Sequence, residues 1–133
     1  MLISFKTIGL VLLGIMIPYA FVSAFGVFID YPWIDIPFHF AGGVWTCLLF
    51  FFLLGNLFSG EFYSHKFERL KTLLLAVSFC AFIGVLWELH EFVLSEWFSF
   101  YLQQGISDTM GDFVMDILGG LFAGYFILFT VKK

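Results

Sequence analysis

The sequence predicts an all-α integral membrane protein, a single domain over residues 1–133 that forms a bundle of four transmembrane helices. Hydrophobic residues make up 62% of the chain and charged residues only 12%, which leaves too few polar side chains to cover a water-soluble globule. The hydrophobic residues also gather in four long stretches, each near or above the ~20 residues with which a helix crosses a bilayer. Such continuous runs are typical of helices, whereas the strands of a membrane barrel are shorter and alternate.

The first two helices are expected at residues 5–28 and 34–58. The first is longer than the apolar core of a signal peptide and is therefore expected to be retained. It has Lys6 as its only ionisable residue, so we expect it to act as a scaffold beside a site on the other three helices. The second opens with Asp35 and Pro37, two residue types that favour a helix start.

The last two helices are expected at residues 70–94 and 109–131. The third follows the only sizeable polar connection of the chain, and the fourth follows Asp108, a residue type that often caps a helix. Small residues at Gly42-Gly43 and at Gly120-x-x-x-Gly124 are expected to let neighbouring helices approach closely.

The basic residues predict the orientation in the membrane. All six fall near the N-terminus, in the middle connection or at the C-terminus: Lys6, Lys66, Arg69, Lys71, Lys132 and Lys133. A four-helix topology places these three regions on one side, and the positive-inside rule makes that side cytoplasmic. We therefore expect a multi-pass protein of the cell membrane with both termini in the cytoplasm.

Ionisable residues within the apolar helices form the candidate site. Counted at 1.5 Å per helical residue, Glu88 lies about 26 Å beyond Lys71 and Asp116 about 24 Å from Lys132, while His39 lies about 30 Å from the inner end of its helix. All three therefore reach one level, near the outer boundary of a hydrocarbon core about 30 Å thick. Their neighbours three or four residues away share a helix face with them. The full candidate set is Asp35, His39, Glu88, Glu91, Asp112 and Asp116.

The chemistry of this set favours a divalent cation. Carboxylates and one imidazole projecting from several helices are the ingredients of carboxylate-bridged metal sites. With mostly hard oxygen donors, Mg²⁺, Mn²⁺ or Ca²⁺ fits better than Zn²⁺. His39 and Glu88 are the candidate general acid or base, because low dielectric and neighbouring charges tune such groups.

Each candidate also has a structural alternative. Asp35 and Asp108 can serve as helix N-caps, and His39 can simply hydrogen-bond a neighbouring carboxylate. The remaining acids lie too far along their helices for capping, so their alternative is a buried polar network. On that reading the acids fix helix register and hold no ligand.

Other polar or reactive residues are expected to lie outside the site. His90 points away from the two glutamates of its helix, and His65 and Glu96 are expected to be solvated. Cys47 and Cys80 lack metal-ligand spacing and are expected to pack as small hydrophobic residues. The chain has no phosphate-binding loop, no serine-nucleophile motif and no basic patch for nucleic acid.

The order of the acidic motifs resembles that of the VanZ-like group of small membrane proteins, and its YjdF-like branch most closely. The resemblance rests on Asp35-x-x-x-His39-Phe40, then Glu88-x-x-Glu91, then an aspartate at every fourth residue from Asp108 to Asp116 before Gly119-Gly120. It spans about three quarters of the chain, with Asp116 where many members have Asn and Glu91 where VanZ has Gln. VanZ is associated with resistance to a glycopeptide antibiotic, so the resemblance implies work near envelope lipids.

Three classes of function follow from these features. The first is a metal-dependent enzyme or binding site for a phospholipid or lipid-linked glycan head group at the outer leaflet, where a cation bridges an anionic head group to acidic side chains. The second is a cation or proton transporter or channel component, which with four helices needs an oligomer. The third is a structural or accessory membrane protein.

Overall fold

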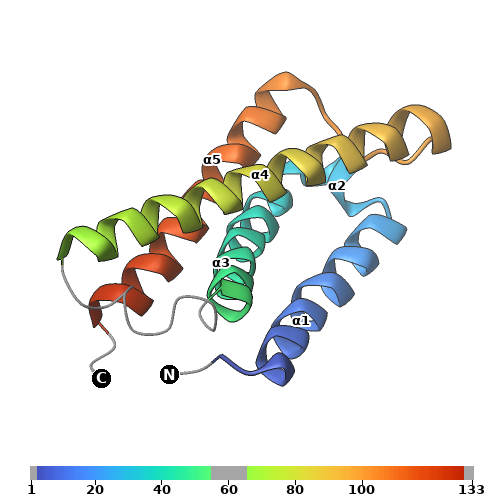
Figure 1. Ribbon diagram of the computed structural model, residues 1–133. Helices are drawn as coiled ribbons and strands as arrows, with labels where there is room; N and C mark the ends of the chain where they lie inside the picture. Colours follow the sequence, from blue (N-terminus) through green and yellow to red (C-terminus); the bar gives the residue numbers. More distant parts are fainter. Residues whose placement is uncertain (1–2, 55–65, 131–133) are drawn as a thin grey trace.

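The computed structural model describes residues 3–54 and 66–130, and within these ranges the chain forms helices and no strands. Four helices are long and apolar enough to cross a membrane, which confirms the all-α class and the number of spans. The elements are α1 (Phe5–Ala24), α2 (Val27–Asp30), η1 (Pro32–Ile34), α3 (Asp35–Leu54), α4 (Lys66–Phe98), α5 (Ile106–Tyr125) and the π-helical turn η3 (Phe126–Thr130). Figure 1 shows the long helices running alternately up and down.

The first predicted helix, 5–28, is interrupted. The Ser4 hydroxyl accepts a hydrogen bond from the Thr7 amide (3.1 Å) and caps the start of α1. At the other end Gly26 adopts a left-handed conformation (φ 65°) that a helix cannot contain, so α1 stops at Ala24 and the short α2 begins after the turn. The predicted span therefore joined two separate helices.

The other helix ends also differ from the predicted ranges. α3 begins at Asp35 after the 3₁₀ turn η1, and the predicted end at residue 58 lies outside the described residues. α4 is four residues longer at each end than 70–94, because its polar first turn continues the helix beyond the apolar stretch and is stabilised by a 3.0 Å Lys71–Glu68 ion pair. α5 begins at Ile106, three residues before the predicted start.

The central packing unit is the pair α3 and α5, with α4 against both and α1 on the outside against α3 (Figure 1). Glycines bring the pair together: a Cβ atom on Gly43 would collide with the backbone carbonyl of Asp116, and one on Gly119 with that of Phe40. Cβ atoms on Gly120 and Gly124 would press on side chains of α4. The glycine prediction is confirmed for Gly43, Gly120 and Gly124.

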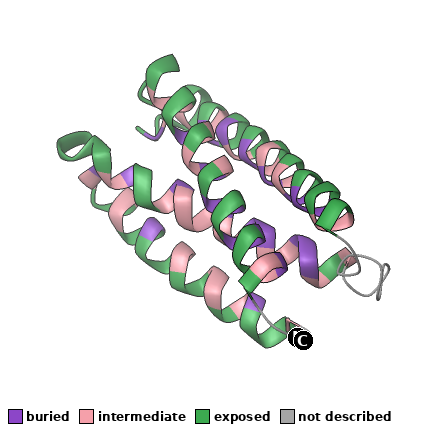
Figure 2. Ribbon diagram, turned by 90° about the vertical axis from the view of Figure 1, so that its left-hand side faces the viewer, coloured by how far each residue is buried: buried purple, intermediate pink, exposed green. Residues whose placement is uncertain are grey.

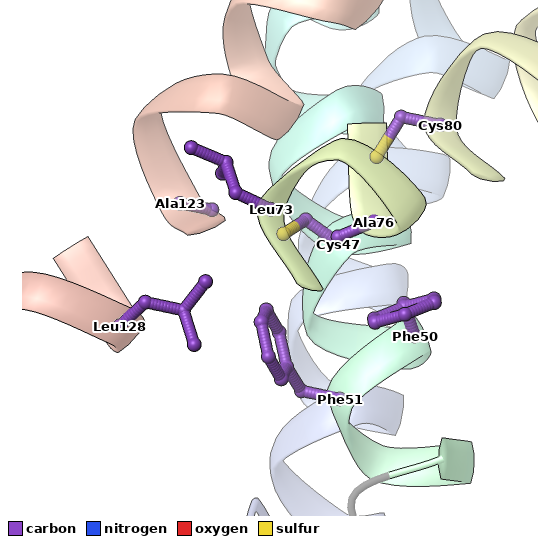
Figure 3. Packing of buried hydrophobic residues seen from close by; sticks show 8 residues of the cluster. All are labelled: Cys47, Phe50, Phe51, Leu73, Ala76, Cys80, Ala123 and Leu128. Atoms are coloured by element: carbon purple, nitrogen blue, oxygen red, sulfur yellow. The ribbon is translucent and has the colours of Figure 1, made fainter. Parts of the chain in front are cut away.

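A hydrophobic core fills the bundle at the end where α3 finishes and α4 begins. Leu128 faces Phe51 there (Figure 3), and the rings of Phe50 and Phe51 have centroids 5.4 Å apart. The two free cysteines lie in the same core, with Cys47 fully buried and Cys80 1% exposed, so both pack as small hydrophobic residues as expected.

Large hydrophobic side chains cover much of the outside, on α1 above all. Only Ile8 and Tyr19 of α1 are buried, whereas Leu10, Ile17 and Phe21 are each more than 60% exposed. Figure 2 shows buried residues on the sides of the helices that face one another and exposed residues on the outward sides. An apolar outer surface of this kind suits lipid and not water.

Candidate functional site

The six predicted residues come together at the end of the bundle where α3 and α5 begin and α4 finishes. Asp35 and His39 are one turn apart on α3, Glu88 and Glu91 lie near the end of α4, and the aspartates lie on α5. All six side chains are buried, with exposures of 2–6%. These six residues are Asp35, His39, Glu88, Glu91, Asp112 and Asp116. Together with the half-buried Asp108 we call them the acidic cluster.

His39 is the centre of the cluster, because its two ring nitrogens face different partners. Nδ1 lies 3.4 Å from Oδ2 of Asp116. Nε2 faces three carboxylate oxygens, at 3.7 Å from Asp35 Oδ1, 3.8 Å from Glu88 Oε1 and 3.9 Å from Asp112 Oδ1. These three separations are too long for hydrogen bonds, so Nε2 and the oxygens around it converge without bonding to one another.

Four buried polar atoms of this group have no hydrogen-bond partner among the described residues: Asp35 Oδ1, His39 Nε2, Glu88 Oε1 and Asp112 Oδ2. A buried polar atom without a partner costs about 1–3 kcal/mol, and more when it is charged. The ion pairs that the structure gives for these acids all involve His39. The described basic residues lie at the other end of the helices: Lys6, Lys66, Arg69 and Lys71.

Asp116 differs in position from the other carboxylates. It lies on the Nδ1 side of the imidazole, away from the point on which the Nε2 partners converge. Its carboxylate packs so closely on α4 that a Cβ atom on Gly84 would collide with Oδ2. Histidines that bind metals donate their second N–H to just such a carboxylate, which fixes the ring and its tautomer. Asp116 is therefore placed to orient His39.

Glu91 is held by residues that the sequence did not single out. Its Oε1 accepts hydrogen bonds from the Tyr19 hydroxyl (2.7 Å) and from the Trp87 indole (2.8 Å). Tyr19 belongs to α1, so the first helix, expected to be a scaffold beside the site, also donates a hydrogen bond to a member of the cluster. A tyrosine within an otherwise apolar helix was the available signal, since a buried hydroxyl needs a polar partner.

The capping alternatives fit poorly. The backbone of Asp35 is already helical (φ −67°, ψ −37°), unlike the extended conformation of an N-cap, and its Oδ1 bonds to nothing. The N-cap of α5 is Gly105 (φ 118°). Asp108 lies three residues later, where its Oδ2 accepts the Gln104 amide hydrogen (3.3 Å).

Three sets of side chains bring ligand atoms within 4.8 Å of one another: Asp35–His39–Glu91, His39–Glu88–Asp112 and Asp35–Asp108–Asp112. In the set His39–Glu88–Asp112, Nε2 lies 3.8 and 3.9 Å from the two carboxylate oxygens, so one cation could contact all three at about the 2.3–2.6 Å typical of Ca²⁺ ligands. The sets share Asp35, His39 and Asp112, and the carboxylates among these are of the kind that bridges two cations. The donors thus fit a hard divalent cation.

The remaining polar residues lie elsewhere. His90 is exposed and contacts the Trp87 ring, with ring centroids 5.2 Å apart. Glu96 is exposed as predicted, and His65 lies outside the described residues.

Comparison with known proteins gives a family but no characterised relative. No curated protein and no solved structure matches the chain. The model of the family described as "Predicted membrane protein (DUF2238)" matches residues 1–133. The chain therefore belongs to the DUF2238 family of predicted membrane proteins.

Proposed function

We propose that this protein binds a divalent cation in the acidic cluster and, through that cation, the phosphate of a membrane lipid head group. The observation that carries the proposal is the environment of His39. Nδ1 lies against the Asp116 carboxylate, and Nε2 faces oxygens of Asp35, Glu88 and Asp112. Nε2 and the facing oxygens of Asp35 and Glu88 are buried and have no hydrogen-bond partner among the described residues. That arrangement matches a histidine ligand oriented by its second nitrogen.

The negative charge of the acidic cluster favours a bound cation over a network of side chains without a ligand. Five buried carboxylates share one imidazole, and burying carboxylates without compensation is costly. Mg²⁺, Mn²⁺ or Ca²⁺ offsets two charges, and a second cation at Asp35, Asp108 and Asp112 offsets two more. Asp108 is half-buried, so that second position is the one nearer the outside.

A lipid head group is the proposed ligand because of the depth at which the cluster lies in the membrane. We propose that both termini are cytoplasmic, because the basic residues lie at that end of the helices. The cluster then lies at the outer leaflet of the cell membrane, near phospholipid and lipid-linked glycan head groups. A cation there can bridge an anionic phosphate to acidic side chains that would otherwise repel it. Glu88 and His39 are the acid–base candidates for any head-group reaction, since both line the cation position.

We also propose that the protein is related to the VanZ-like proteins, and to the YjdF-like branch most closely. In support, the residues that carry the resemblance come from α3, α4 and α5 and lie in one cluster. Work on envelope lipids is what that resemblance implies.

A transport function has less support. Between the cluster and the cytoplasmic end, the described residues form the hydrophobic core of Cys47, Phe50, Phe51 and Leu128. The buried polar side chains at that end are those of Thr46 and Thr72, which form no continuous ionisable path. Cation flux into liposomes reconstituted with the purified protein would favour transport over head-group binding.

Elemental analysis of protein purified in mild detergent without chelator tests the cation. We expect at least one divalent cation per chain in the wild type and less than a tenth of that in the double variant Glu88→Gln, Asp112→Asn. The control Glu68→Gln alters an exposed carboxylate and should retain the metal. Equal, negligible metal in all three proteins, unchanged after titration with Mg²⁺, Mn²⁺ and Ca²⁺, would refute the proposal.

A further inference from the structure

A cavity of about 230 Å³ lies between α1, α3 and α4 and opens onto the acidic cluster. Asp35, His39 and Asp116 form one end of its lining, together with Tyr19. The rest of the wall is largely apolar and includes Leu12, Ile15, Met16, Phe38, Trp45 and Ile83. For comparison, an engineered cavity of about 150 Å³ in a protein core binds benzene.

The cavity is elongated along the helices, and its two ends differ in chemistry. On α1 the lining runs from Tyr19 to Leu12, and on α3 from Asp35 to Thr46, so it extends roughly 10–16 Å at 1.5 Å per residue. The lining residues next to the cluster are Tyr19 on α1 and Asp35 on α3, which carry a hydroxyl and a carboxyl group. The lining residues farther along both helices lie toward the middle of the bilayer. A polar end near the membrane surface with an apolar channel leading inward is the shape of an amphiphile.

The position of α1 gives such an amphiphile a way in from the side. α1 packs chiefly on α3 (Figure 1), and it meets α4 at Tyr19, whose hydroxyl donates a hydrogen bond to Glu91. The walls are also thinned by Gly42 and Gly84, which line the cavity without side chains. An apolar cavity beside the bilayer is not a stable site for water, whereas hydrocarbon fills it without losing hydrogen bonds.

We infer that the cavity holds one hydrocarbon chain of a lipid whose phosphate is bound, through the divalent cation, at the acidic cluster. This inference rests on the proposed function, and it adds the substrate class: an anionic phospholipid or lipid-linked phosphate recognised by head group and chain together. A cluster of carboxylates without the cation would instead prefer an amine head group, and the test below separates these cases.

The matched pair of variants is Met16→Trp and Ile17→Trp. Met16 lines the cavity, so a tryptophan there occupies the space of the chain. Ile17 is its neighbour, 65% exposed on the outside of α1, and controls for a bulky residue in this helix. Gly42→Leu is a second way to fill the cavity, since a Cβ atom there meets only Asp116 Oδ1, at 3.8 Å. Gly14→Leu is its control, because nothing lies within 4 Å of that site.

Binding of radiolabelled dioleoyl phosphatidic acid to protein in detergent is measured with Mg²⁺ and with chelator, and the bound Mg²⁺ is counted in every variant. We expect saturable lipid binding that needs Mg²⁺ and weakens at least tenfold in Met16→Trp and Gly42→Leu. The two control variants should bind as the wild type does, with Mg²⁺ content equal in all five proteins. Trp45 and Trp87 line the cavity, so in the wild type dibromostearoyl phosphatidic acid should quench tryptophan fluorescence more than the matching phosphatidylcholine.

Several results would overturn the inference while leaving the cation site intact. These are unchanged lipid binding by both cavity-filling variants, equal binding with chelator, a preference for phosphatidylethanolamine, or inorganic phosphate competing as strongly as the lipid. Absence of Mg²⁺ from every protein would instead mean that the proposed function itself has failed.

Discussion

Replacing Asp112 with Asn should have opposite effects on stability without and with a divalent cation. Ligand oxygens of Glu88 and Asp112 lie within 4.8 Å of each other. At an effective dielectric constant of 20, two like charges at that separation repel by about 3.5 kcal/mol. Removing one charge should therefore stabilise the cation-free protein by up to that amount. The gain is smaller if the cluster binds protons, because a protonated carboxylate no longer repels its neighbour. For a chain of this size, about 3 kcal/mol corresponds to a rise in Tm of roughly 10 °C.

With the cation the order should reverse. A ligand at 1,000 times its Kd stabilises the folded state by about 4.1 kcal/mol, and we expect the wild type to gain this and Asp112→Asn to gain little. The assay is thermal unfolding in mild detergent at pH 8, followed by tryptophan fluorescence, in chelator and in Mg²⁺ or Mn²⁺. Glu68→Gln serves as the control, because its carboxylate pairs with Lys71 on the surface. If Asp112→Asn is less stable than the wild type in chelator and neither protein responds to cations, the cluster is a structural network and the reasoning is wrong.

Three further predictions concern the supports of the cluster. Gly43→Ala should lower the free energy of unfolding by more than about 2 kcal/mol and abolish cation binding, because the added methyl group collides with the backbone of α5. In the same assays Gly9→Ala, where nothing lies within 4 Å, should keep cation binding and raise the free energy of unfolding by up to about 1 kcal/mol, the gain in helix propensity. Tyr19→Phe should cost about 1.5–3 kcal/mol in chemical unfolding, because the hydrogen bond to Glu91 is lost, yet keep the full metal content; loss of metal would show that Tyr19 acts on the cation site. Cation affinity should fall as pH is lowered from 8 to 6, because protons compete for carboxylates and for His39, and calorimetric titration showing no pH dependence would contradict ligation by these groups.

The level of the cluster could be predicted from the sequence, but its internal arrangement could not. Depth depends only on the helical rise, so counting residues from the basic ends placed His39, Glu88 and Asp116 together. The direction in which a side chain leaves its helix depends on how the helices rotate against one another. Contacts at Gly43 and Gly119 set that rotation, and only the structure shows that Asp116 meets Nδ1.

The residues at which the helices begin and end were predicted incorrectly for a related reason. Hydropathy marks the part of a chain that lies in hydrocarbon, whereas a helix ends where its backbone conformation changes or its last turn loses support. The turn at Gly26 breaks an apolar stretch that looks continuous by composition. At Lys66 the helix begins in a polar segment that composition excludes. The role of Tyr19 was missed because the first helix was judged by its charges alone.

The cost of the cluster itself argues that it is functional. Replacing a buried ionic network by well-packed apolar residues is often neutral or stabilising, so an acidic cluster that only fixed helix register would be an expensive solution. Here the free-energy cost is larger still, because four buried polar atoms have no partners among the described residues. Close packing at the glycines also holds the surrounding backbone in place. A rigid scaffold around unpartnered donors is what ligand binding requires, since the site is then organised before the ligand arrives. An apolar replacement of Asp35, His39, Glu88, Asp112 and Asp116 together should therefore fold with stability equal to or above that of the cation-free wild type, measured by unfolding in chelator, and should bind no cation. A large loss of stability in that variant would return the cluster to a structural role.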